Sequence, residues 1–112
     1  MIDGVIDVDD TTAVEMCQYL LKYEGLFLGG SSGINVAGAF WLAKKLGPGH
    51  TIVTVLCDTG SGYIGKIYNE KFLAEKNIIV TKKTPQEFLG AFDGRQIKIE
   101  LLKVCANHFY CL

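Results

Sequence analysis

The chain alternates between short apolar runs and stretches in which apolar positions recur at helical spacing. Residues 26–28 are all apolar and stop at a glycine-serine turn, which leads into a helix-like pattern of small and apolar residues. A second apolar run, residues 51–57, lacks strict alternation and ends in a polar loop that contains glycine. Such runs are typical of buried parallel strands. The pattern therefore predicts an α/β fold built on a β-α-β unit with parallel central strands and a right-handed crossover.

Four helices are predicted from apolar stripes that are bounded by cap and stop residues. The first covers residues 13–21, with Thr12 and Glu15 at capping-box spacing and Gly25 as its stop. The helix of the β-α-β unit is expected to begin near Gly33. Either Ser31 or Ser32 is predicted to cap that helix. A third helix is predicted over residues 70–76, with Asn69 as its cap. A fourth begins with Thr84 and Pro85 and ends at Asp93 and Gly94.

Charge and composition narrow the class of protein. A formal net charge of -1 gives no electrostatic reason to expect binding to nucleic acid or to an anionic membrane. No apolar run is long enough to span a bilayer, and the acidic start of the chain does not resemble a targeting peptide. The four cysteines are irregularly spaced, which favours a reduced, cytoplasmic protein over a disulfide scaffold.

Two glycine-containing loops are candidates for chemistry. The loop over residues 29–33 precedes a helix, so its free N–H groups could bind an anion or a cofactor, although a plain tight turn explains the same residues. The loop over residues 58–62 follows the presumed central strand, at the sheet edge where ligands bind in open parallel sheets. Its hydroxyls, Thr59 and Ser61, could bind a ring nitrogen or a phosphate oxygen, and an ordinary capped loop is the alternative.

The other candidate groups match no motif of a metal site or a Schiff-base lysine. Cys105, His108 and Cys111 are spaced three apart, but a closed zinc site needs a fourth ligand, so no metal site is predicted. Lys66 is the lysine nearest to the threonine loop, yet it lies in no motif typical of a Schiff-base lysine. No catalytic residue is therefore assigned from the pattern.

Two stretches, EGLFLGGSSGINVAGA at residues 24–39 and LGPGHTIVTVLCDTG at residues 46–60, closely resemble the C-terminal part of cysteine synthases. These enzymes belong with the cystathionine β-synthase-like, pyridoxal-phosphate-dependent enzymes of fold type II. The resemblance runs from about residue 9 to residue 77 and includes YNEKFL at residues 68–73. It implies a partial three-layer α/β/α unit.

The resemblance also implies roles for the two loops. Thr59 matches the hydroxyl residue that faces the pyridine nitrogen of pyridoxal phosphate in the family. A hydroxyl there leaves the nitrogen unprotonated, which suits β-elimination from an activated serine followed by addition of sulfide or another thiol. The residues expected to form the cofactor wall around Thr59 are Asp58, Gly60, Ser61, Gly30, Ser31 and Ser32.

Some features depart from the family. Gly62 stands where an arginine is usual, and Gly65 stands where a hydroxyl residue often follows. The Schiff-base lysine, the substrate loop and the phosphate cradle precede this region in the family. Residues 1–82 are therefore expected to be the C-terminal portion of such an enzyme, inactive alone, with residues 83–112 as a divergent helix and tail of unknown role.

The sequence raises two other classes of function. A non-catalytic interaction module, associating with a partner or with itself through an exposed apolar sheet edge, is the alternative to the enzyme. A small nucleotide-binding domain is set aside because the acidic ribose-binding residue is missing. The family resemblance implies an amino-acid substrate and sulfide or a thiol as partners, and a homodimer.

Overall fold

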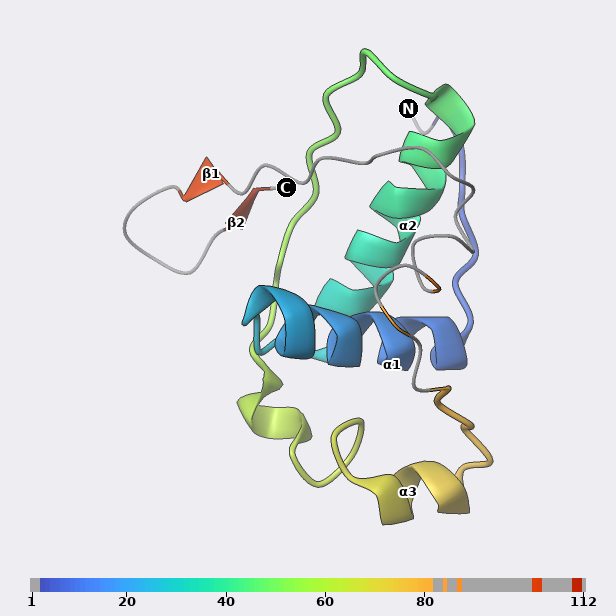
Figure 1. Ribbon diagram of the computed structural model, residues 1–112, viewed down its shortest axis with the longest axis vertical. Coiled ribbons are helices and arrows are strands. Elements are labelled where there is room, and N and C mark those ends of the chain that lie inside the picture. Colours follow the sequence, from blue (N-terminus) through green and yellow to red (C-terminus); the bar gives the residue numbers. More distant parts are fainter. Residues whose placement is uncertain (1–2, 82–83, 85–86, 88–101, 104–109, 112) are drawn as a thin grey trace.

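The structure, a computed structural model, describes residues 3–81, 84, 87, 102–103 and 110–111. Two helices that cross form its centre, and a short third helix lies beyond them (Figure 1). The elements are α1 (Asp10–Tyr19), the π-helix η1 (Leu20–Glu24), α2 (Gly30–Leu46), the 3-10 helix η2 (Gly60–Tyr63), α3 (Glu70–Glu75), β1 (Leu102–Lys103) and β2 (Tyr110–Cys111).

Helix α1 begins earlier than the sequence predicts, because Asp9 caps it. The Asp9 carboxylate accepts hydrogen bonds from the Thr12 backbone N–H and from the Thr12 hydroxyl, each at 2.8 Å. These hydrogen bonds lower the pKa of Asp9. The predicted Thr12–Glu15 capping box is therefore wrong. Glu15 instead accepts from the N–H and the hydroxyl of Thr81, at 3.1 and 2.7 Å.

The end of this first helical stretch follows the prediction. The π-helix η1 continues α1 to Glu24, and Gly25 then adopts a left-handed conformation with φ of 69°. The N–H of Leu26 bonds back to the carbonyl of Leu20 at 3.1 Å. A glycine is favoured at this stop, because a residue with a side chain is strained at positive φ.

Helix α2 begins at Gly30, about one turn before the predicted start, with Gly29 as its N-cap. Ser32 therefore lies in the first turn and not at the cap position. The helix ends as predicted, with Gly47 at φ 77° donating to the carbonyl of Ala43 at 2.9 Å. Lys44 and Lys45 lie in the last turn, where positive charge opposes the negative end of the helix dipole.

The core lies where α1 crosses the N-terminal half of α2 (Figure 1). A glycine allows the two helices to approach closely. A Cβ on Gly33 would lie 2.4 Å from the Cys17 sulfur and 2.7 Å from the Ala13 carbonyl oxygen. Eight side chains fill the core on either side of this contact: Met16, Tyr19, Leu20, Leu28, Val36, Ala37, Phe40 and Leu56.

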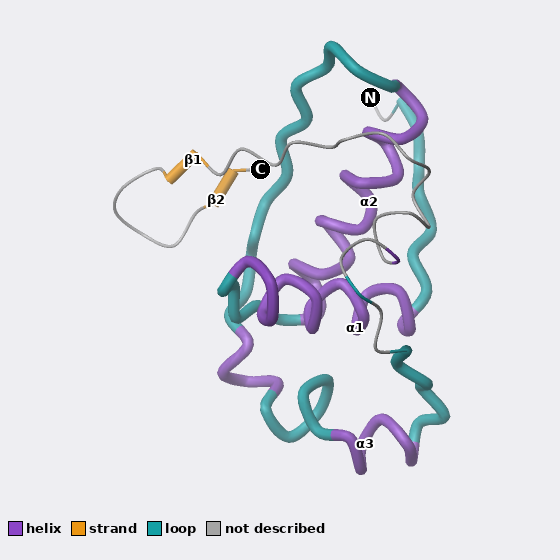
Figure 2. Tube along the Cα trace, in the orientation of Figure 1, coloured by secondary structure: helices purple, strands orange, loops and turns teal. Residues whose placement is uncertain are grey.

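The predicted parallel β-α-β unit is not confirmed. Residues 51–58 are extended and run beside α2 (Figure 2), where the Asn35 amide donates to the carbonyl of Val55 at 2.8 Å. Within residues 3–81 the single β-bridge is antiparallel and joins Leu28 to Thr59. A strand needs neighbours to satisfy its backbone groups, and the described part of the chain gives residues 51–58 none beyond this bridge.

The later segments follow their cap residues. Asn69 caps α3 through the Lys71 N–H at 3.0 Å, which confirms that prediction. Thr84 and Glu87 form the reciprocal bonds of a capping box, at 2.9 and 3.2 Å, which confirms the predicted helix entry, while the body of that helix lies outside the described residues. The strands β1 and β2 pair antiparallel. No helix in the described part of the chain is long and apolar enough to cross a membrane.

Candidate functional site

The two glycine-containing loops meet at the N-terminal end of α2. The N–H of Gly29 donates to the carbonyl of Asp58 at 3.2 Å, and the N–H of Gly60 donates to the carbonyl of Phe27 at 3.0 Å. These two hydrogen bonds lie on either side of Thr59 and form the antiparallel bridge to Leu28. The structure thus brings together two segments that the sequence singled out separately.

The Asp58 carboxylate holds the second loop against α2. Its Oδ1 atom accepts from the backbone N–H of Ser32 at 3.0 Å and lies 2.5 Å from the Ser32 hydroxyl. The same hydroxyl lies 3.1 Å from the backbone N–H of Asp58. Oδ2 accepts from the Tyr63 hydroxyl at 2.9 Å. Ser32 is fully buried in this contact.

This network sets the charge of Asp58. Burial opposes ionisation, but the hydrogen bonds from Ser32 and Tyr63 outweigh it, and the pKa of Asp58 lies below its usual value. The same hydrogen bond raises the pKa of Tyr63. Asp58 is therefore a carboxylate at neutral pH, and its charge lies near the positive end of the α2 dipole.

Two glycines make this contact sterically possible. A Cβ on Gly29 would lie 2.3 Å from Asp58 Oδ2 and 2.5 Å from the Tyr63 ring. A Cβ on Gly60 would lie 2.4 Å from the Phe27 ring. Both glycines thus allow protein to approach protein. Gly30 differs, because a Cβ there would meet Tyr63 at 3.6 Å, an ordinary contact distance.

Thr59 and Ser61 form the exposed part of the site. Their hydroxyl oxygens are 2.5 Å apart, and either one can be the donor. Thr59 lines a cavity of about 430 Å³, whose other walls are residues 25–28 and 56–58. These features fit pyridoxal phosphate on the ring-nitrogen side, since the donor set is neutral hydroxyl and the cavity is mostly apolar.

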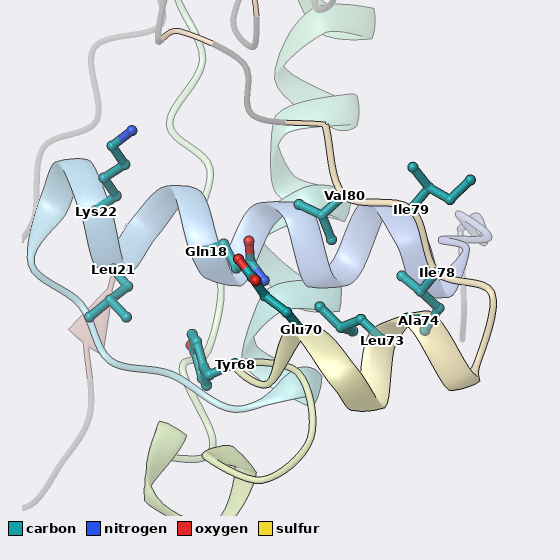
Figure 3. Close-up of a pocket in the computed structure, with 10 residues that line it drawn as sticks. All are labelled: Gln18, Leu21, Lys22, Tyr68, Glu70, Leu73, Ala74, Ile78, Ile79 and Val80. Carbon is teal, nitrogen blue, oxygen red and sulfur yellow. The ribbon is translucent and has the colours of Figure 1, made fainter.

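A larger cavity, which the sequence did not predict, lies between η1, α3 and residues 78–80 (Figure 3). It has a volume of about 590 Å³ and a mostly apolar lining. Tyr68 lines it and donates its hydroxyl to the carbonyl of Leu28 at 2.5 Å. Burial raises the pKa of Tyr68 to about 12, so this hydroxyl stays a donor at neutral pH.

The other predicted positions are placed as follows. Ser31 is exposed, Gly30 is half-buried at the start of α2, and Lys66 is exposed. The contact of Tyr63 was not predicted from the sequence, and its only signal was its place directly after the second loop. The described residues contain no cluster of three or more metal-ligating groups. The side chains of Cys105, His108 and Cys111 lie outside the described part.

Comparison with known proteins identifies the class. Residues 1–58 match the family described as "Pyridoxal-phosphate dependent enzyme". This match covers about half of the chain, so the chain belongs to the pyridoxal-phosphate dependent enzyme family. The class predicted from the two loops is confirmed. Pyridoxal phosphate is the cofactor that gives the family its name.

Within that family the chain is similar to cysteine synthases, as the sequence predicts. It is 50% identical over 91 residues to cysteine synthase 2 of Schizosaccharomyces pombe. The matched region covers 81% of this chain and 23% of the relative. It is 46% identical over 88 residues to the cysteine synthase of Dictyostelium discoideum, covering 79% of this chain and 23% of the relative. The chain thus spans under a quarter of the length of these relatives. The matches do not favour the interaction-module alternative.

Proposed function

We propose that this chain forms the ring-nitrogen wall of the pyridoxal phosphate site in a cysteine synthase-like enzyme. The enzyme would replace the β-substituent of an activated serine with sulfide to give cysteine. The observation that carries the proposal is the exposed residue Thr59, which lines a cavity and is flanked by backbone hydrogen bonds at Asp58 and Gly60. The similarity to cysteine synthases supports the choice of reaction.

The chemistry follows from the hydroxyl pair. A hydroxyl has one donor hydrogen and two acceptor lone pairs. If Ser61 donates to Thr59 across their 2.5 Å contact, the Thr59 proton is left to bond an unprotonated ring nitrogen. When bound, pyridoxal phosphate supplies the electron sink for elimination and addition at the β-carbon. A neutral hydroxyl cannot transfer its proton to the ring nitrogen, whereas a carboxylic acid could.

The proposal divides the predicted site residues into two groups. Thr59 and Ser61, with Gly30 and Ser31, are proposed to form the wall that faces the cofactor. Gly60 is buried against the Phe27 ring and supports this wall. Asp58 and Ser32 support that wall from behind, because their side chains bond each other and the second carboxylate oxygen of Asp58 accepts from Tyr63. None of these residues is proposed to be catalytic.

Thr59→Val tests the proposal, since valine keeps the shape and removes the hydroxyl. We would place this chain in the matching stretch of the Schizosaccharomyces pombe relative and measure binding of pyridoxal phosphate by fluorescence, together with cysteine formation. Loss of one hydrogen bond to the ring should weaken binding roughly tenfold and change the absorption spectrum of the bound cofactor. Thr59→Ser is the matched control and should stay close to the parent chimera. Equal affinity and an unchanged spectrum for Thr59→Val would refute the proposed contact.

The 112-residue chain alone is proposed to lack catalysis. All lysines whose side chains are described are exposed except Lys44, which is half-buried. Exposed lysines react with pyridoxal phosphate without site preference. After incubation with the cofactor and borohydride, mass spectrometry should show scattered, substoichiometric labelling. One stoichiometrically labelled lysine together with turnover would contradict this expectation.

The proposal also includes the fold, the oligomeric state and the location of the intact enzyme. It includes the α/β architecture of fold type II, in which residues 51–58 act as a strand. Alternating exposure along this segment supports that assignment, because every second residue is buried or half-buried, as in a strand with one covered face. A homodimer and a cytoplasmic location are further parts of the proposal. The free thiols of Cys17 and Cys57 support a reducing compartment.

A further inference from the structure

Helix α2 takes its N-terminal hydrogen-bond acceptor from a distant residue. Its own N-cap, Gly29, has no side chain to accept a bond. The acceptor for the first-turn amide of Ser32 is the carboxylate of Asp58, at 3.0 Å and 26 residues further along the chain. A buried helix N-terminus needs such an acceptor, and a negative charge there is favourable.

The same carboxylate also holds the residue that directly follows the second loop. Its other oxygen accepts from the hydroxyl of Tyr63, the last residue of η2. Thr59 and Ser61 lie between Asp58 and Tyr63 in the chain. The short segment that carries both hydroxyls is therefore tied at its two ends to a single carboxylate.

A carboxylate suits this position better than an amide. All three side-chain contacts come from donors: the Ser32 N–H, the Ser32 hydroxyl and the Tyr63 hydroxyl. A carboxylate has two acceptor oxygens, whereas an asparagine has one oxygen and places an NH₂ group where the other stood. The close approach of Gly29 to Oδ2 leaves little room for the longer side chain of glutamate.

We propose that Asp58 is a positioning residue that fixes the Thr59 and Ser61 hydroxyls in the orientation that they present to the cofactor ring. This inference rests on the proposed function. In this inference the Asp58 carboxylate orients Thr59 and does not contact the cofactor. Asp58 acts through the ends of the loop and through the backbone hydrogen bonds on either side of Thr59.

The test is NMR spectroscopy of the full 112-residue chain without cofactor. Three-bond couplings to the Thr59 γ-methyl carbon report whether its χ1 angle occupies one rotamer or averages over several. The parent should show one rotamer. In Asp58→Asn, these Thr59 couplings should take values averaged over several rotamers. We expect them to differ at least twofold from the couplings of the parent. Asp3→Asn makes the same charge change at an exposed position and should leave Thr59 unchanged.

Tyr63→Phe provides a second variant that keeps the Asp58–Ser32 contact and removes one hydrogen bond. It should give couplings between those of the parent and those of Asp58→Asn. Tyr63→Phe also keeps the inference testable if Asp58→Asn fails to fold. Amide exchange in α2 distinguishes the positioning of Thr59 from a purely structural role of Asp58. If Asp58 only capped the helix, its replacement would alter the exchange protection of α2 without releasing Thr59. Unchanged Thr59 couplings in a folded Asp58→Asn or Tyr63→Phe variant would overturn the inference.

Acid titration gives an independent readout. Because the pKa of Asp58 lies below its usual value, Thr59 should keep one rotamer down to pH values at which ordinary carboxyls are already protonated, and lose it below them. The other titratable groups that interact with Asp58 are Cys17, Tyr63 and Tyr68, and all three have raised pKa values. None of them changes charge in acid. Release of Thr59 at higher pH than the protonation of Asp58 would contradict the inference.

Addition of pyridoxal phosphate to the chimera with the Schizosaccharomyces pombe relative distinguishes this inference from the proposed function, since the 112-residue chain alone is not expected to hold the cofactor. If the cofactor shifts no Thr59 or Ser61 resonance while Asp58→Asn releases Thr59, the positioning stands and the cofactor contact fails. If the cofactor shifts these resonances and Asp58→Asn leaves Thr59 fixed, the contact stands and the positioning fails.

Discussion

Gly33→Ala is expected to destabilise the protein by roughly 1–3 kcal/mol, as is typical when a core is overpacked. The added methyl group would lie 2.4 Å from the Cys17 sulfur and 2.7 Å from the Ala13 carbonyl oxygen, so α1 and α2 would have to separate. An exposed helical glycine gains about 1 kcal/mol from the same change, but here the clash outweighs that gain. The expected fall in melting temperature is roughly 10 °C for a domain of this size.

The chain contains a matched control for this variant. Gly38 lies in the same helix, and a Cβ there would meet nothing within 4 Å. Gly38→Ala should therefore stabilise the protein by up to about 1 kcal/mol. Urea unfolding followed by circular dichroism measures both changes. A Gly33→Ala variant as stable as Gly38→Ala would show that the two helices do not approach as closely as described.

Ser32→Ala is expected to have the second large effect, a loss of roughly 1.5–3 kcal/mol, the usual contribution of a hydrogen bond to a charged group. The Ser32 hydroxyl lies 2.5 Å from Asp58 Oδ1 and 3.1 Å from the Asp58 backbone N–H, and Ser32 is fully buried. Removing it leaves the backbone amide of Asp58 without this partner. The loss of stability should be smaller below the pKa of Asp58, where the carboxyl is protonated in both proteins.

Ser31→Ala is the control for this variant. Ser31 precedes Ser32 in the same helical turn but is exposed. Its replacement should change the free energy of unfolding by less than about 0.5 kcal/mol, as for most surface substitutions. Chemical unfolding of both variants at neutral pH compares them directly. Equal losses for the two serines would mean that burial of the Ser32 hydroxyl does not contribute to stability.

Local signals predicted most of the helical ends. The cap at Asn69, the stop at Gly25 and the capping box of Thr84 and Glu87 all depend on residues within six positions of one another. The start of α1 was misplaced for a local reason as well, since Asp9 competes with Thr12 for the cap and has two carboxylate oxygens to offer. Such competition is decided by side-chain geometry, which the spacing alone does not contain.

The candidate site was predicted in part. The sequence singled out both loops, yet it placed the serines as caps of α2, whereas the structure gives that role to Asp58. The acceptor comes from 26 residues away, and no local pattern encodes a contact of that range. Strand pairing has the same limit. Residues 51–57 read as a buried strand, but pairing depends on neighbours, and within residues 3–81 the structure has one antiparallel bridge, between Leu28 and Thr59.

The site closes across a long stretch of chain, and this has a consequence for loop-closure entropy. The contacts between residues 27–32 and residues 58–60 enclose all of α2 and the exposed turn at residues 47–50. The entropy of closing such a loop grows only with the logarithm of its length, so that even doubling the loop costs about 0.6 kcal/mol. Helix α2 spans about 25 Å at 1.5 Å per residue, which keeps the turn far from Thr59. Length variation at this turn is thus nearly independent of the geometry of the site.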